Sequence, residues 1–235
     1  GYASNSGNID DLARFGFNEV DSSTVIRSDL VSTNALTASY DIKINDVAIG
    51  ASDSASAASK AIAINAVSSS TNVTASGDNL VTLDLNFSEA STAASNISIN
   101  GNTINFGSVT NETETITAIN NASIGDIVAT ANSSGDVQLA SASGADIVIA
   151  HNGTPGVFFD GHTDATGATI SVNSSVTFKG QILLTHNEGD VIKISGDDVG
   201  ELGFQAQASS SASTPGSIIS VSTSSNATSA LTAVD

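Results

Sequence analysis

This chain contains an internal repeat, which limits the folds that it can adopt. The pattern I-x-I-N-[DG]-x-x-I occurs at residues 42–49 and again at residues 97–104, which is 55 positions later. Similarity at a fixed offset indicates that one supersecondary unit occurs twice. Further matches at the same offset are Ala63-Ile64-Asn65 with Ala118-Ile119-Asn120, and Val73 with Val128. The offset rises to 58 between Gly77-Asp78 and Gly135-Asp136, which indicates a late insertion in the second copy.

Each copy begins with a predicted β-hairpin. The I-x-I segment alternates apolar and polar residues, as a half-buried strand does. Asn45-Asp46 and Asn100-Gly101 follow as turn dipeptides. Asn-Gly favours a type I′ turn, because both central residues of that turn need positive φ. The chain then returns through Ile49 in the first copy and through Ile104 in the second.

A helix is predicted next in each copy. In the first copy, apolar residues recur at three- and four-residue spacing and form one stripe along the helix. They are Ala57, Ala58, Ala61, Ile62 and Ala66. Asp53 suits the positive N-terminal end of this helix. In the second copy, Asn111 is the expected N-cap, with Glu114 as its reciprocal partner three residues later. Ile116 and Ile119 are expected to face inward.

Two strands and a turn complete each copy. Residues 72–76 and 126–130 read as strands, and Gly77-Asp78-Asn79 and Gly135-Asp136 read as the turns that follow them. Residues 81–85 alternate as a fourth strand. Each copy is therefore predicted to be a β-hairpin, a helix and a β-hairpin, with the helix packed on a small antiparallel sheet.

The rest of the chain carries strand signals without a helical period. The strands predicted there are residues 157–159, 169–172, 181–185 and 190–194, with a hairpin turn at residues 187–190. Residues 206–217 are rich in Ser and Ala and predict a linker. A strand at residues 218–222 and the start of a helix at residues 228–235 follow it.

A weaker similarity links the two ends of the chain. Residues 10–17 and 197–204 both read D-D-[LV]-x-x-[FL]-G-F. The pattern predicts a short helical turn that ends at a glycine and is followed by a buried phenylalanine.

Together these patterns predict an α+β, β-rich fold with two β-hairpin–helix–β-hairpin units and an additional antiparallel β segment. The predicted segments are an N-terminal β and turn segment (1–38), the first unit (39–95), the second unit (96–150), the antiparallel β segment (151–205) and a Ser- and Ala-rich linker that leads into a C-terminal core helix (206–235).

The charge balance excludes two classes of partner. Six Lys and Arg residues face 24 Asp and Glu residues, for a net charge of −18. Phosphate binding needs clustered basic residues, and anionic lipid surfaces repel an acidic chain. Neither nucleic acid nor membrane is therefore an expected partner. Because cysteine is absent, disulfides and thiolate metal sites are excluded as well.

Motifs that carry chemistry are scarce. The three histidines, His151, His162 and His186, lie in no H-E-x-x-H arrangement. The segment Asp160-Gly161-His162-Thr163-Asp164 admits a Ca²⁺ or Zn²⁺ site or an ordinary solvated loop. We prefer the solvated loop, because the other ligands of an EF-hand are missing. No G-x-S-x-G elbow occurs. We predict no catalytic, cofactor-binding or metal-binding residue, no cofactor and no enzymatic activity.

The repeated pattern resembles a motif of a known family. I-x-I-N-[DG]-x-x-I followed by A-I-N is similar to the flagellin hook IN motif, which occurs in the variable middle regions of bacterial flagellins and in some hook-associated proteins. Here it appears at residues 42–49 with Ala63-Ile64-Asn65, and at residues 97–104 with Ala118-Ile119-Asn120. The end of the chain, residues 227–235, is similar to the start of the flagellin C-terminal core helix.

The resemblance implies a structural subunit of the flagellar filament, with this segment as its surface-exposed outer domains. Such subunits are exported through a type III channel and act in motility outside the cell. They bind other flagellin subunits mainly through long core helices, which we expect to lie outside these 235 residues. Host surfaces or glycans are a second class of partner. The alternative is a hook-associated or cap-type flagellar protein or an adhesin-like binding module, since these share the motif.

Overall fold

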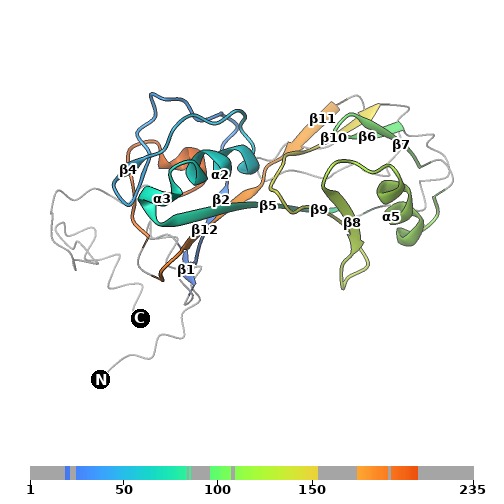
Figure 1. Ribbon diagram of the computed structural model, residues 1–235. Helices are drawn as coiled ribbons and strands as arrows, with labels where there is room; N and C mark the ends of the chain where they lie inside the picture. Colours follow the sequence, from blue (N-terminus) through green and yellow to red (C-terminus); the bar gives the residue numbers. More distant parts are fainter. Residues whose placement is uncertain are drawn as a thin grey trace, which may run out of the picture.

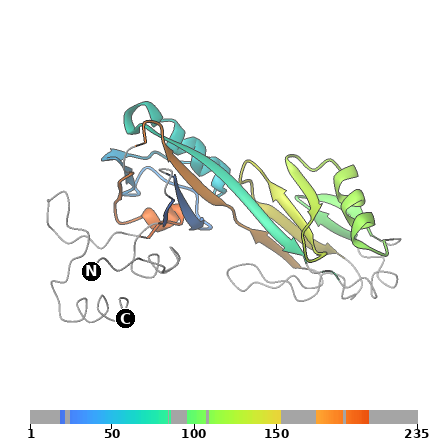
Figure 2. The same ribbon diagram turned by 90° about the horizontal axis from the view of Figure 1, so that it is seen from below.

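A computed structural model describes residues 19–21, 25–83, 85, 96–106, 109–152, 174–189 and 192–205. The fold is mixed α+β and rich in antiparallel strands, which confirms the predicted class. Two lobes lie at opposite ends of one long strand, β5 (Val73–Leu83) (Figures 1 and 2). The inner lobe has its core at residues 26–75 and 182–204, and the outer lobe at residues 81–176.

One six-stranded sheet runs through both lobes. In spatial order its strands are β1 (Glu19–Asp21), β2 (Val25–Leu30), β12 (Gln181–His186), β5, β9 (Val137–Ser141) and β8 (Ile127–Ala131). Residues 73–78 of β5 pair with β12, and residues 79–83 pair with β9. A single strand therefore belongs to both lobes.

β5 corrects one prediction about the first repeat. Its residues alternate between the buried and the outer face without a break from Val73 to Leu83. The turn predicted at Gly77-Asp78-Asn79 is therefore wrong, and so is the hairpin it was expected to close. These three residues are typical of a turn, but each half of the strand has an antiparallel partner, and the backbone stays extended.

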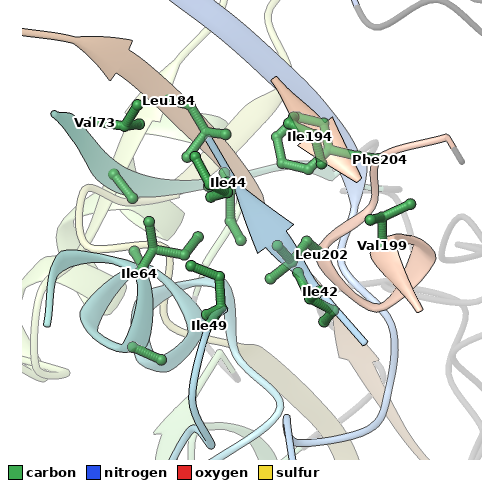
Figure 3. Packing of buried hydrophobic residues seen from close by; sticks show 14 of the residues in the cluster. Ile42, Ile44, Ile49, Ile64, Val73, Leu184, Ile194, Val199, Leu202 and Phe204 are labelled. Carbon is green, nitrogen blue, oxygen red and sulfur yellow. The ribbon is translucent and has the colours of Figure 1, made fainter. Parts of the chain in front are cut away.

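The inner lobe adds a small sheet and helices to the long sheet. Its elements are β13 (Ile194–Ser195), β3 (Lys43–Ile44) and β4 (Val47–Ala48) in that spatial order, with α2 (Ala57–Asn65), α3 (Ser68–Thr71) and the 3₁₀ helix η1 (Val199–Leu202). Figure 3 shows Ile44, Ile64 and Leu184 meeting in its core from three different elements. The helical turn predicted near residue 200 is confirmed, because η1 ends at Gly203 (φ 80°) and Phe204 is buried.

The outer lobe contains the second repeat. A four-stranded sheet has the order β11 (Ser174–Phe178), β10 (Ile147–Asn152), β6 (Asn96–Ile99) and β7 (Asn102–Asn105). Helix α5 (Glu112–Asn121) follows the β6–β7 hairpin and packs on β8. β8 and β9 then form a hairpin, so the sequence of hairpin, helix and hairpin predicted for this copy is confirmed.

The β-rich segment predicted at residues 151–205 is divided between the lobes. β11 pairs with β10 in the outer lobe, whereas β12 and β13 belong to the inner lobe. The strand predicted at residues 181–185 is confirmed as β12. The hairpin predicted at residues 187–190 is wrong, because β12 pairs with β2 and β5 while β13 pairs with β3. The turn at Asn187–Gly189 instead carries the chain from one sheet to another.

Several predictions fall outside the described residues. They are the first copy of the D-D motif (10–17), the strands at 157–159 and 169–172, the loop Asp160–Asp164 with His162, the linker at 206–217, the strand at 218–222 and the terminal helix. Within the described ranges, no helix is long and apolar enough to cross a membrane.

Candidate functional site

The two lobes repeat one structural plan, and the hairpin of the I-N motif is its first element. Asn45 and Asp46, at the tip of β3–β4, have φ angles of 48° and 65°. Asn100 and Gly101, at the tip of β6–β7, have φ angles of 47° and 79°. A type I′ turn needs positive φ at both central positions, and the predicted turn is confirmed in both copies.

The asparagine of each hairpin also binds the backbone of a third segment, directly before β13 in the inner lobe and within β10 in the outer lobe. Asn45 donates its backbone N–H to the Lys193 carbonyl at 2.8 Å, and its Oδ1 accepts from the Lys193 N–H at 2.8 Å. Asn100 makes the same pair of bonds with Val148, at 2.8 and 2.7 Å. Its Nδ2 also donates to the Asp146 carbonyl. This position therefore selects Asn for two reasons, positive φ and a side chain that continues the strand ladder.

The second repeated asparagine joins helix to strand. In the inner lobe, Asn65 Nδ2 donates to the Ala75 carbonyl at 2.8 Å, and Asn65 Oδ1 accepts from the Ala75 N–H at 2.7 Å. In the outer lobe, Asn120 makes the same two bonds with Ala129, at 2.9 and 2.8 Å. The A-I-N motif thus combines a buried isoleucine with a side chain that ties the end of the helix to the next strand.

The structural register corrects one repeat match. Val73 is fully buried, whereas Val128 is 53% exposed. The residue that corresponds to Val73 is Ile127, because Asn65 and Asn120 bind Ala75 and Ala129, each two residues further on. A shift of one residue moves a strand side chain to the opposite face, so the predicted match of Val73 with Val128 between the two copies of the repeat is wrong.

The second half of the plan was not found by sequence reasoning. Residues 189–194 of the inner lobe and 144–149 of the outer lobe both read G-x-x-I-x-I, with an offset of 45. Gly189 and Gly144 have φ angles of 83° and 78°. Ile194 pairs with Ile44 as Ile149 pairs with Ile99. The offset of 45 was the available signal. In this match the outer-lobe segment comes first in the chain, whereas in the match at offset 55 the inner-lobe segment comes first.

These two offsets mean that one copy is nested inside the other. In the outer lobe, β8 and β9 are joined by a tight turn, in which the Asn132 N–H donates to the Asp136 carbonyl at 3.0 Å. The corresponding strands of the inner lobe are β5 and β12, whose last pair is Asp78 with Gln181. In the inner lobe, the short turn that would join these two strands is replaced by the whole outer lobe.

The junction of the lobes, which we call the neck, consists of residues 77–79, 141–146 and 178–180. Three glycines make its closest contacts. A Cβ on Gly77 would lie 2.4 Å from the Ser143 carbonyl oxygen, and one on Gly144 would lie 2.7 Å from the Gly77 Cα. A Cβ on Gly180 would lie 2.5 Å from the Asp78 carbonyl oxygen and 3.1 Å from the Ala57 Cβ. Gly77 therefore serves close packing rather than a turn.

Polar contacts fasten the same junction. Asn79 is 4% exposed, and its Nδ2 donates to the carbonyls of Ala145 and Phe178 at 2.9 and 2.8 Å. The Ala58 N–H, in the first turn of α2, donates to the Gly144 carbonyl at 3.1 Å. Free N–H groups at a helix start need such an acceptor, and here the outer lobe supplies it. Lys179 and Asp146 form an ion pair with Nζ–Oδ2 at 2.7 Å.

The neck loop at residues 141–146 is held by its own hydrogen bonds. Asp126 Oδ2 accepts from the Ser141 hydroxyl at 2.8 Å and from the Ser143 N–H at 3.0 Å. Burial opposes the ionised form of Asp126, but the hydrogen bonds from Ser143 and Ser141 outweigh it and lower the pKa of this carboxyl. The loop is therefore braced from the outer-lobe side before it meets the inner lobe.

Both helices begin at equivalent caps. Ser56 Oγ accepts from the Ser59 N–H at 3.2 Å, and Asn111 Oδ1 accepts from the Glu114 N–H at 3.0 Å, which confirms Asn111 as an N-cap. The Glu114 carboxylate, however, binds the N–H and hydroxyl of Thr110 rather than Asn111. These bonds lower the pKa of Glu114. Asp53 lies three residues before the cap, so it is not in the first turn of α2.

The stripe predicted on the first helix is partly wrong. Ile62 is 67% exposed, while Lys60 is fully buried. Lys60 Nζ donates to the Ser32 carbonyl at 3.2 Å, the Ser32 hydroxyl at 3.0 Å and the Glu201 carbonyl at 2.7 Å. Burial lowers the pKa of Lys60 to about 8, against the opposing field of Glu201. Pattern reasoning missed Lys60 because its aliphatic stem packs as an apolar side chain while its head is satisfied by hydrogen bonds.

The contact between Ser32 and Lys60 has the elements of a serine–lysine catalytic pair, but its hydrogen bonds argue against that role. A lysine base must have a free lone pair, and all three donor positions of Lys60 meet acceptors. The Ser32 hydroxyl contacts the Glu201 carboxylate and accepts from the Asn34 N–H. These buried hydrogen bonds join α2 to the segment after β2 and to η1.

The two described histidines lie in different lobes. His151 is buried in the outer lobe on β10, and its Nε2 has no hydrogen-bond partner within the part of the chain that the structure describes. His186 is buried in the inner lobe on β12, and its Nδ1 accepts from the Glu188 N–H. Among the described residues, no three His, Asp or Glu side chains gather as a metal site.

Comparison with known proteins adds no relative to this picture. The sequence matches no family model, and no curated protein is detectably similar to it. What the arrangement can do must therefore be argued from the residue pattern and the geometry. Its distinctive part is the neck, which fixes one copy of a repeated unit on the end of another.

Proposed function

We propose that this chain forms the surface-exposed outer domains of a bacterial flagellar filament and has a structural role, without enzymatic activity. One observation carries the proposal: the I-N hairpin and A-I-N helix recur in two nested lobes, and each repeated asparagine makes the same backbone bonds in both. The motif resembles the one found in the middle regions of flagellins, and here its residues have a definite structural purpose.

The route of the chain supports a projecting module. The described chain begins with β1, which pairs with β2, and it leaves the inner lobe after η1, which lies beside β2. The Asp29 N–H donates to the Gly203 carbonyl at 2.9 Å, and Gln205 contacts Asp29 through their side chains. The outer lobe lies beyond the neck from both segments (Figure 2). Any structure that holds both flanks of the inner lobe would thus carry the outer lobe away from itself.

The charge supports a solvent-facing role. A net charge of −18 opposes close association between copies of this chain at low salt. In the proposed filament, subunits would bind one another mainly through core helices outside this segment, while the acidic lobes face solvent, host surfaces or glycans. The proposed location is extracellular, after type III export.

Immunogold electron microscopy tests the proposal directly. Antibodies raised against this chain would be applied to intact cells of the source organism, with pre-immune serum as the control. Outer domains of the filament subunit predict gold particles along the whole length of each filament. Label confined to the filament tip or to the hook junction would contradict the proposal and favour a cap-type or hook-associated protein. Label on the cell body alone would favour an adhesin.

A further inference from the structure

We infer that the neck is a rigid joint, which makes the two lobes one body and sets the orientation of the outer lobe. The inference goes beyond the proposed function and does not depend on it, since it concerns the isolated chain. Two lobes joined by two chain crossings commonly move about a hinge, so the fixed geometry requires its own argument.

The two crossings contain almost no loop. A hinge needs a few residues at loops or element ends that absorb changes in φ and ψ. The first crossing is β5, which continues through the neck and pairs with β12 on one side and β9 on the other. The second runs from β11, which ends at Phe178, to β12, which begins at Gln181. Only Lys179 and Gly180 lie between these strands, and both make contacts in the neck.

The neck is also braced from one side. A two-stranded ribbon alone would twist and bend easily. Here the first turn of α2 and the loop 141–146 pack against the ribbon where Ala57, Gly77, Gly144 and Gly180 meet. The backbones approach so closely that a single methyl group would overlap them. Closely packed interiors have low compressibility and transmit strain, so the neck resists bending.

Bending at the neck would break buried polar bonds. Asn79, the first residue of β5 that pairs with β9, holds the carbonyls of Ala145 and Phe178 and so fixes the loop 141–146 and the end of β11 against β5 at the neck. The Ala58 N–H and the Val31 N–H both reach across the neck, to the carbonyls of Gly144 and Gly180. Leaving such groups unsatisfied and buried is costly. The neck therefore favours one orientation.

Pulsed electron paramagnetic resonance measures this orientation. The chain has no cysteine, so Ile62→Cys on α2 and Val128→Cys on β8 provide the only two labelling sites, and both positions are exposed. A rigid joint predicts a single narrow distance distribution in the full chain. A broad or two-peaked distribution would overturn the inference, whatever the variants show.

Matched glycine variants test what sets the orientation. Gly77→Ala and Gly180→Ala place a methyl group against backbone atoms, and neither glycine has positive φ. We expect each to broaden or displace the distance distribution. Gly50→Ala and Gly200→Ala, whose added methyl meets nothing within 4 Å, are the controls and should leave it unchanged.

A further variant covers the case in which a glycine variant does not fold. Asn79→Ala adds no bulk and removes both carbonyl contacts. It should broaden the distribution while near-native circular dichroism is retained. A distribution unchanged in Asn79→Ala and in every folded glycine variant would show that these contacts do not set the orientation. The immunogold result is independent of all these outcomes.

Discussion

Lys60 in the inner lobe and Thr115 in the outer lobe occupy the same place in the repeat, 55 residues apart, and both are fully buried. Lys60 binds three oxygens of the segment after β2 and of η1. Thr115 satisfies its hydroxyl within its own helix, by donating to the Asn111 carbonyl at 3.0 Å. The repeated plan therefore tolerates either side chain, provided that its polar atoms find hydrogen-bond partners.

The lobes differ again in what surrounds that position. In the inner lobe the helix packs against chain segments from both ends of the described region, and Lys60 joins them. In the outer lobe the helix is neighboured by β8 and β7, which are close in sequence. The buried lysine therefore occurs where the helix packs against segments that are distant in sequence. The buried threonine occurs where the helix packs against segments that are close in sequence.

The largest expected effects come from the equivalent core isoleucines. Ile64→Ala and Ile119→Ala should each lower the free energy of unfolding by about 2–5 kcal/mol, because each leaves a cavity in a closed core. Urea unfolding would measure the free energy of unfolding of each variant, and amide hydrogen exchange would locate the loss of stability. Because β5 is shared, exchange should accelerate along β5 in both variants. Ile62→Ala, at an exposed position on α2, is the control and should change stability by less than about 0.5 kcal/mol. Loss confined to one half of β5 would show that the lobes unfold separately.

Smaller effects are expected from the asparagines that join helix to strand. Asn65→Ala and Asn120→Ala each remove two hydrogen bonds to the following strand, at a cost of about 1–3 kcal/mol. The two losses should be similar and additive in the double variant, since the sites share no partner. Chemical denaturation measures all three variants. If one of the two variants lost almost no stability, the two asparagines would be equivalent in geometry but not in their contribution to the free energy of unfolding.

The Lys60 position predicts a difference in pH dependence. Its folded pKa of about 8 lies below the ordinary lysine pKa of 10.5, so between these values the unfolded chain binds more protons. Stability should therefore rise as pH increases from about 8 to 10.5, and the cost of burying the charge is fully present below pH 8. Lys60→Met should abolish this rise. Lys193→Met, at an exposed lysine, is the control, and thermal unfolding across this pH range is the measurement. An equal rise in Lys60→Met would refute the assignment.

The smallest effect concerns the helix caps. Hydrogen bonds from Thr110 lower the pKa of Glu114 below the ordinary glutamate pKa of 4.5. The stability they contribute is present above pH 4.5 and is lost as pH falls through the folded pKa. The inner-lobe counterpart is Ser59, which does not titrate. Glu114→Gln should therefore reduce the acid sensitivity of the outer lobe, as monitored by hydrogen exchange in α5. Glu188→Gln, in an inner-lobe turn, controls for the lost charge and should leave α5 unchanged.

Local chemistry made several features predictable from the sequence. Asn45-Asp46 and Asn100-Gly101 announce turns with positive φ, and the structure has both. The place of Asn111 before a helical period predicts an N-cap, and its side chain caps α5 in the structure. The hairpin, helix and hairpin of the second unit followed from such signals, because both hairpins close between neighbouring segments. Where the partners of a segment lie close in sequence, spacing and turn chemistry are sufficient.

Local sequence patterns thus specify the repeated unit, an I-N hairpin followed by a helix. The way in which the two units combine depends on contacts between segments that are distant in sequence. Gly77 has the same local signature whether it turns the chain or admits a neighbouring backbone, and the choice depends on Gly144 and Gly180, which are distant in sequence. Lys60 looks like a surface residue until Ser32 and Glu201 are brought to it. Strand pairing and close packing are non-local, so the nesting of one lobe in the other and the neck that joins them appear only when the chain is folded.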